Sequence, residues 1–158
     1  MKRLGFEIGW GLICGDGCYL LSAKDTILNA KNFSSLSLPQ ELLKNIESLG
    51  YAEMTPIQAQ SLPTILLGKD VIGQAKTGSG KTAAFGLGIL ARLDTSSLQV
   101  QALVFCPTRE LADQVSKAIR QFARMSPNVK VLTLCGGMPS RPQVKSLEHG
   151  AHIVVGTP

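Results

Sequence analysis

Hydrophobic and polar residues alternate with a changing period from Asn32 onward. Between residues 40 and 50, leucine and isoleucine recur at intervals of three and four, which predicts a helix ending at Gly50. Ser37 and Gln40 have the spacing of a capping box at its start. The run 55–58 predicts a second helix start, and Pro63 is expected to end or bend that helix.

Further along, short apolar runs rich in Val, Ile and Leu alternate with helical patterns. The predicted strands are 70–74, 101–106, 129–135 and 152–156, and the predicted helices are 80–93, 108–125 and 140–150. Ser140 and Gln143 are expected to open the last of these helices. Strand–helix alternation predicts an α/β fold, with a parallel sheet covered by helices on both faces.

Composition sets the class of protein but not its chemistry. The chain has 158 residues, of which 44% are hydrophobic and 17% charged, so one domain with a real core is expected. No run of 18 residues is apolar and uncharged, which argues against a membrane-spanning helix and a membrane partner. The net charge of +5 favours phosphate-bearing partners, but a soluble protein that is merely basic explains it equally well.

The four cysteines predict neither a disulfide framework nor a zinc site. Cys106 and Cys135 lie in apolar runs, where a free thiol behaves as a small hydrophobe. Cys14 and Cys18 are a pair without a second pair of Cys or His at ligand spacing. A reducing, cytoplasmic location is therefore expected.

Residues 1–31 match no functional pattern. A signal peptide is disfavoured because Glu7 and Asp16 interrupt the apolar stretch and no small-residue cleavage site follows. We expect an unassigned leader, either disordered or translated from upstream of the true start.

The strongest chemical signal is a glycine-rich run between a predicted strand and a predicted helix. Its residues are Ala75, Lys76, Thr77, Gly78, Ser79, Gly80, Lys81 and Thr82. The pattern is that of a P-loop, with Ala75 in the place of the first glycine. Gly78 and Gly80 would turn backbone N–H groups toward a phosphate, Lys81 would reach the terminal phosphates, and Thr82 would hold Mg²⁺. The alternative is a glycine-rich turn that caps a helix.

A P-loop alone does not hydrolyse ATP, because the reaction also needs an acidic cluster, normally at the end of another strand. The three later strands are followed by Pro107, Gly136 and Thr157, and no two acidic residues are adjacent in the chain. The hydrolytic half of the site is therefore expected to be missing.

Three further features accompany the P-loop. They are Phe33 with the run 50–60 (GYAEMTPIQAQ), the run 107–112 (PTRELA), and Gly136-Gly137 with Thr157-Pro158. In this order and spacing they resemble the DEAD-box ATP-dependent RNA helicases. The resemblance covers 32–158 and implies the N-terminal part of a first RecA-like helicase domain, with a Q motif at 33–60, the P-loop at 75–82, motif Ia at 107–111 and the start of motif Ib at 157–158.

The resemblance implies that ATP and Mg²⁺ bind at the Q motif and the P-loop. The implied nucleotide-binding residues are Phe33, Thr55, Gln58 and all eight residues from Ala75 to Thr82, with Lys81 and Thr82 in the catalytic roles. Gln58 would pair with the adenine edge, and Phe33 would stack on the adenine face. The alternatives are that Gln58 is only a capping-box partner of Thr55, and that Phe33 is a core aromatic.

The resemblance also implies RNA as a partner. The implied contacts are Pro107, Thr108, Arg109, Glu110, Gly136, Gly137 and Thr157. Alternatively, Thr108 is only an N-cap, Arg109 pairs with Glu110 or Asp113, and the glycine pair is a plain turn. Lys117, Arg120 and Arg124 share a helical face, which we interpret as solvated rather than as an RNA patch.

The remaining helicase motifs, D-E-A-D, S-A-T and the second domain, do not occur in the sequence. The fragment is expected to bind without hydrolysis or unwinding and to be unstable, because central strands would lack neighbours. The resemblance implies a parent acting on large-subunit ribosomal RNA in ribosome assembly. The alternatives are a non-hydrolysing nucleotide- or RNA-binding module, or a non-functional truncated product. A P-loop kinase would need neither the Q motif nor the PTREL run, and the oligomeric state stays open.

Overall fold

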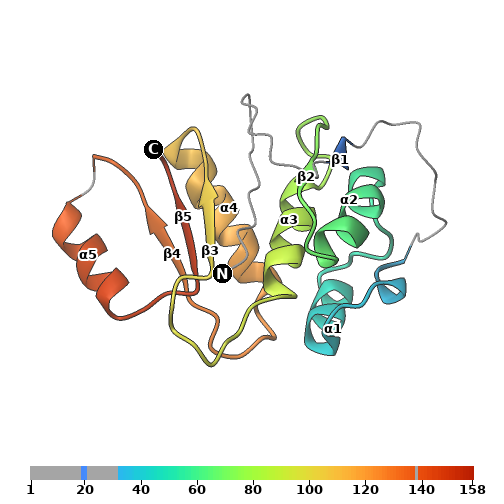
Figure 1. Ribbon diagram of the computed structural model, residues 1–158, viewed down its shortest axis with the longest axis horizontal. Helices are drawn as coiled ribbons and strands as arrows, with labels where there is room; N and C mark the ends of the chain where they lie inside the picture. Colours follow the sequence, from blue (N-terminus) through green and yellow to red (C-terminus); the bar gives the residue numbers. More distant parts are fainter. Residues whose placement is uncertain (1–18, 21–31, 138) are drawn as a thin grey trace.

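The structure, a computed structural model, describes residues 19–20, 32–137 and 139–158. Figure 1 shows helices packed around short parallel strands. In chain order the elements are β1 (Tyr19–Leu20), the 3₁₀ turn η1 (Phe33–Ser35), α1 (Gln40–Ser48), α2 (Pro56–Leu66), β2 (Val71–Ile72), α3 (Lys81–Leu90), β3 (Ala102–Phe105), α4 (Arg109–Phe122), β4 (Val131–Leu134), α5 (Ser140–Glu148) and β5 (Ile153–Gly156).

Every strand pairing is parallel, as the alternation of strands and helices predicted. β3, β5 and β4 form one sheet in that spatial order, with Leu103 opposite Val154 and Val154 opposite Leu132. β2 pairs instead with β1 in a separate two-stranded ladder. In the described residues, the strand before the P-loop is therefore not hydrogen-bonded to the sheet that carries the later motifs.

Helices lie on both faces of the three-stranded sheet, so the predicted fold class is confirmed. On one face, Thr133 of β4 donates a hydrogen bond from its Oγ1 to Ser116 Oγ of α4 over 2.7 Å. The neighbouring Leu132 points to the opposite face, where it lines a shallow hollow with residues of α5. Side chains of successive strand residues alternate between faces, which places α4 and α5 on opposite sides of β4.

Two of the predicted helix caps are wrong, although α5 begins at Ser140 as predicted. α1 has Pro39 as its N-cap and no side-chain cap, so Ser37 and Gln40 do not form a capping box. At α5 the N-cap is Pro139, and the Gln143 side chain pairs with the Cys135 backbone, accepting from its N at 3.1 Å and donating to its O at 3.2 Å. In both cases proline occupies the cap, so a hydroxyl beside it cannot be the capping group.

Element lengths differ in two other places. Pro63 lies inside α2, which continues to Leu66, so the proline does not end the helix. The predicted strand 70–74 is reduced to Val71–Ile72, because β2 pairs only with the two residues of β1.

The leader contributes one described element. Tyr19 and Leu20 form β1, which pairs with β2. The rest of 1–31, including Cys14 and Cys18, lies outside the described residues.

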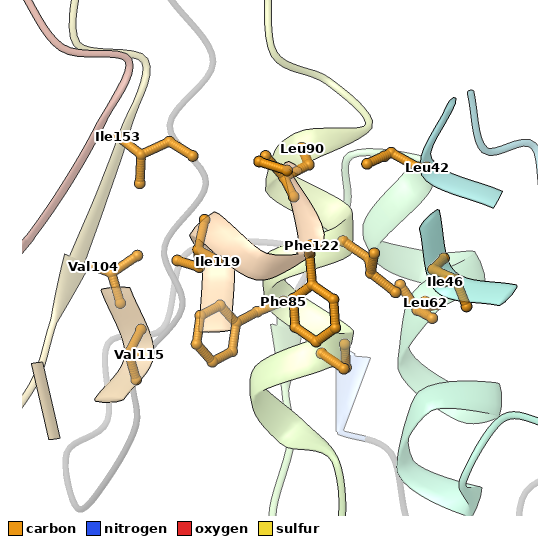
Figure 2. Packing of buried hydrophobic residues seen from close by; sticks show 14 of the residues in the cluster. Leu42, Ile46, Leu62, Phe85, Leu90, Val104, Val115, Ile119, Phe122 and Ile153 are labelled. Carbon is orange, nitrogen blue, oxygen red and sulfur yellow. The ribbon is translucent and has the colours of Figure 1, made fainter. Parts of the chain in front are cut away.

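The core lies between the helical layer and the sheet. Figure 2 shows Phe85 of α3 and Phe122 of α4 at its centre, flanked by Leu62 and by Val104. Each fully buried side chain of this size contributes about 1.5–3 kcal/mol to folding. α3 therefore packs between α2 and α4, and the core holds the first turn of α3, where the P-loop ends.

A buried amide joins α1 to α4. Asn45 Nδ2 donates to the backbone oxygens of Gln121 and Phe122, at 2.9 Å and 2.6 Å. These carbonyls lie in the last turn of α4, where oxygens lack partners further along the helix, although Gln121 O also accepts from Arg124 N at 3.3 Å. Because the amide satisfies them, α1 is held at the carboxyl end of α4.

One face of β3 carries exposed apolar side chains. Leu103 and Phe105 are 50% and 52% exposed, whereas Val104 between them is 3% exposed. Within the described residues β3 is hydrogen-bonded to a strand on one side only. An apolar strand with a free edge is a template for pairing with other chains.

We expect Phe105→Lys to reduce self-association of the 158-residue chain without lowering its melting temperature. A lysine at this half-exposed edge position adds repulsion between copies, and its aliphatic stem can cover the surface that the ring leaves. Light scattering and a thermal melt measure the two effects, with Val104→Lys as the buried control, which should unfold the chain. A wild-type chain that stays monomeric at high concentration would contradict this expectation.

Candidate nucleotide and RNA sites

The loop 75–82 lies between β2 and α3, as its sequence predicts. Gly78 has φ +79° and Gly80 has φ +91°, which are left-handed conformations that glycine adopts without strain. Gly80 is the N-cap of α3, so the loop leads directly into a helix N-terminus. Backbone N–H groups and the helix dipole at such a position favour a bound phosphate.

Lys81 is folded over this loop. Its Nζ donates to the backbone oxygens of Ala75 and of Lys76, the latter at 2.7 Å. Carbonyl oxygens are weaker partners for an ammonium group than an anion is. Lys81 is therefore held at the loop by contacts that a phosphate can replace, and Thr82 follows it as a half-buried residue of the first helical turn.

Two hydroxyl groups at the loop are buried without a hydrogen-bond partner. They are Ser79 Oγ and Thr55 Oγ1. Buried polar atoms without partners are costly unless a ligand or water satisfies them. A Cβ placed on Gly78 would meet no atom within 4 Å, so the space above the loop is open. These features fit a nucleotide phosphate with its Mg²⁺. Lys81 would hold the phosphate, and Thr82 would hold the Mg²⁺.

Gln58 joins α2 to the P-loop. Its Oε1 accepts from Thr55 N at 2.9 Å, and its Nε2 donates to Gly80 O at 3.1 Å. The side chain is 0% exposed. The capping-box contact proposed as the alternative is thus present, together with a loop contact that the sequence did not indicate. One N–H and one lone pair of the amide remain for another partner, so pairing with adenine stays a prediction.

Phe33 is a core residue in this structure. It is 4% exposed and packs edge-on against Tyr51, with ring centroids 6.4 Å apart. Tyr51 in turn lies 5.8 Å from the Phe122 ring. This placement agrees with the alternative interpretation of a core aromatic, and stacking on adenine stays a prediction.

The predicted RNA-contacting residues meet at one edge of the sheet. Phe105, Gly156 and Leu134 are register partners at the ends of β3, β5 and β4. The residues that follow these strands, 106–110, 157 and 135–137, must therefore emerge side by side. Thr157 is tied to this edge by its N–H, which donates to Leu134 O at 3.2 Å. In Figure 1 the end of β5 and the turn before α3 lie along the same upper edge of the molecule.

Thr108 caps α4 as the alternative interpretation proposed. Its Oγ1 accepts from Leu111 N at 3.3 Å. Arg109 follows at the first helical position and is exposed. Within the described part of the chain it has no carboxylate at ion-pair distance, so the expected alternative pairing with Glu110 or Asp113 is not found.

Arg109 instead lies against the glycine pair at the end of β4. A Cβ built on Gly137 would come within 2.7 Å of Arg109 Nη1 and 2.8 Å of its Cζ, and closer still to Nη2. No sequence signal indicated this contact between residues 28 positions apart. It brings motif Ia and the glycine pair into one cluster.

The second basic group on α4 has partners within the protein. Lys117 forms an ion pair with Asp113 over 2.7 Å. Arg120 Nη2 donates to Val131 O at 2.9 Å and to Thr133 Oγ1 at 3.4 Å. These contacts are made by exposed side chains, in agreement with the interpretation of this face as solvated.

The two described cysteines, Cys106 and Cys135, are free thiols. Burial raises the pKa of the Cys106 thiol, and nearby Cys135 raises that pKa further. No group of three His, Cys, Asp or Glu side chains suited to a metal occurs among the described residues. The same residues include no helix long and apolar enough to cross a bilayer.

A parallel α/β sheet with this strand–loop–helix unit defines the class of P-loop nucleotide-binding proteins. A sequence model of the DEAD/DEAH box helicases matches residues 55–158. The chain belongs to the DEAD/DEAH box helicase family, as the motifs predicted.

Individual relatives agree with this assignment. The chain is 61% identical to the ATP-dependent RNA helicase DbpA of Escherichia coli K12 over 80% of its own length and 28% of that protein. It is 52% identical to the DEAD-box ATP-dependent RNA helicase CshA of Streptococcus pneumoniae TIGR4, over 80% of this chain and 24% of that protein. The chain thus spans about a quarter of the length of these relatives.

A solved structure has the same fold. It is a DEAD box protein from the hyperthermophile Methanococcus jannaschii, which superposes with a TM-score of 0.76 at 36% sequence identity. The match covers 81% of this chain and 35% of that one. The RecA-like helicase fold predicted from the motifs is therefore confirmed.

We expect Gly80→Ala to destabilise the chain more than Gly78→Ala. Both substitutions place a Cβ at positive φ, which costs about 1–2 kcal/mol. At Gly80 the Cβ would also lie 3.1 Å from Gln58 Cδ, and closer to Nε2, so the buried amide must move and its bonds are lost, at about 1–3 kcal/mol. Urea unfolding of both variants measures the difference. Equal losses would show that Gln58 does not hold the loop.

Proposed function

We propose that this chain binds ATP with Mg²⁺ at the loop 75–82 and the backbone of RNA at the neighbouring sheet edge, as the N-terminal part of an ATP-dependent RNA helicase. The observation that carries the proposal is the P-loop itself. Lys81 is held over the loop by carbonyl oxygens, and the Ser79 hydroxyl is buried beside it without a partner. A bound phosphate group would give the Lys81 ammonium an anionic partner and would give the Ser79 hydroxyl a hydrogen-bond acceptor.

The nucleotide would be held by groups on three elements. Loop N–H groups and Lys81 would bind the phosphates, and Thr82 would coordinate Mg²⁺. Gln58 would read adenine with the N–H and lone pair left free by its two protein contacts. In this role Gln58 would link recognition of the base to the shape of the phosphate loop.

RNA would lie along the carboxyl edge of β3, β5 and β4. The proposed contacts come from Pro107 to Glu110, from Gly136 and Gly137, and from Thr157. Contacts of this kind, from a helix N-terminus and a guanidinium group, bind phosphates and carry no base specificity. The proposal therefore gives this part of the protein affinity for RNA rather than choice of sequence.

Hydrolysis is not expected from this chain alone. The residues directly after β3, β4 and β5 are Cys106, Cys135 and Thr157, so the described strands end without a carboxylate to hold Mg²⁺. The same observation favours the second candidate, a module that binds nucleotide and RNA without turnover. For the longer helicase we propose ribosomal RNA of the large subunit as the substrate, on the resemblance of 127 residues of this chain to DbpA. We propose the cytoplasm as its location, because the described cysteines are free thiols.

We expect Lys81→Ala to weaken binding of a fluorescent ATP analogue by about 10- to 100-fold, because a charge-assisted contact to phosphate is lost. Lys44→Ala, which removes the same charge from an exposed position on α1, is the matched control and should bind normally. Fluorescence titration and a thermal melt of each variant separate binding from folding. In the longer helicase, the same substitution should abolish ATP turnover. Unchanged affinity in Lys81→Ala would refute the phosphate role.

We expect Gln58→Ala to weaken binding of the ATP analogue more than that of the matching GTP analogue. The reason is that only adenine would lose its pairing partner, while loosening of the loop affects both nucleotides. Gln60→Ala, on the same helix and half-buried, serves as the control. An equal loss for both analogues would mean that Gln58 acts only on the loop.

A further inference from the structure

We propose that Gly137 is a positioning residue: it leaves the space in which the Arg109 guanidinium is seated, facing the edge where RNA would bind. This inference rests on the proposed RNA contact of that edge. The two glycines after β4 then have different roles: Gly136 leaves room for a phosphate, and Gly137 leaves room for Arg109. From the sequence, both glycines were expected to contact RNA.

The space around the two glycines is different. Gly137 has φ +72°, and a Cβ there would lie 2.7 Å from Arg109 Nη1 and 2.8 Å from its Cζ. A Cβ on Gly136 would meet nothing within 4 Å, and its φ is not positive. Open space at Gly136 fits close approach of a phosphate. At Gly137 the corresponding space is filled by the guanidinium.

The charge around Arg109 leaves its exposed guanidinium available to an external anion. Arg109 is the first residue of α4, where the helix dipole is positive and disfavours a cation. Within the described residues no carboxylate lies at ion-pair distance from it. The Thr108 hydroxyl beside it is directed to Leu111 N as a cap. A guanidinium held at a positive helix end without a counter-ion is placed to receive a phosphate.

A methyl group at position 137 would act mainly on the position of this guanidinium. Arg109 is exposed, and the atoms that collide are at the far end of a flexible side chain, so they can move away at little cost. The expected effect on folding is the backbone strain at positive φ alone. The expected effect on RNA is loss of the contact that Arg109 makes.

The test is a double-mutant cycle on the 158-residue chain, read by fluorescence anisotropy with a fluorescein-labelled oligouridylate. Arg109→Ala and Gly137→Ala should each weaken binding by about 5- to 10-fold and lower the slope of log affinity against log salt by about 0.7. The double variant should bind no more weakly than Arg109→Ala. Gly50→Ala, which places a Cβ at φ +80° with nothing within 4 Å and lies outside the proposed RNA contacts, is the matched control and should keep the salt slope of the wild type.

Two outcomes overturn the inference. One is wild-type affinity in Gly137→Ala. The other is additive losses in the double variant, because additivity would show that Gly137 acts without Arg109. Backbone strain is present in both backgrounds and cancels in the cycle.

A second measurement separates this inference from the proposed function. The Arg109 Nε–H signal in a ¹⁵N NMR spectrum reports the guanidinium environment without any RNA. If the wild type does not bind the oligouridylate, the proposed RNA role of this edge is refuted. The Arg109 Nε–H signal then still tests whether Gly137 positions the guanidinium. A signal that moves in Gly137→Ala and not in Gly136→Ala supports the seat, whereas an unmoved signal refutes it.

Discussion

The candidate nucleotide site depends on one buried amide. Gln58 bonds through its oxygen to the start of α2 and through its nitrogen to Gly80 at the end of the phosphate loop. Because the side chain is fully buried, these bonds are not weakened by competing water. The amide thus connects α2, which carries the predicted Q motif, to the N-terminus of α3. A shift in the position of either helix end would strain or break a hydrogen bond to the other.

The proposed RNA edge depends on a different constraint, the register of the parallel strands. Pairing of Phe105 with Gly156 and of Gly156 with Leu134 makes three strands end at one level. The loops that follow are separated along the chain, yet they emerge as neighbours. The seat of Arg109 against Gly137 is a product of this register, since neither residue has a local reason to meet the other.

Within the described residues, the two candidate sites belong to parts of the fold that are joined by helix packing and not by strand pairing. β2, which leads into the P-loop, pairs with β1, while the proposed RNA edge belongs to β3, β5 and β4. α3 and α4 connect these parts through the core around Phe85 and Phe122. Leu103 and Phe105 of β3, the strand at one end of the three-stranded sheet, stay about half exposed.

The sequence by itself determined the family, the order of strands and helices, and the P-loop, because each of these is written in local spacing. It also indicated both possible roles of Gln58, since a capping pattern and a Q motif use the same glutamine. The tertiary structure decided the contacts between residues that are distant in the sequence, which the local spacing of residues does not specify. Prolines displaced the expected caps of α1 and α5, the core enclosed Phe33, and strand register placed Arg109 on Gly137. Each of these outcomes depends on which distant surfaces meet, and that is set by burial and pairing across the whole fold.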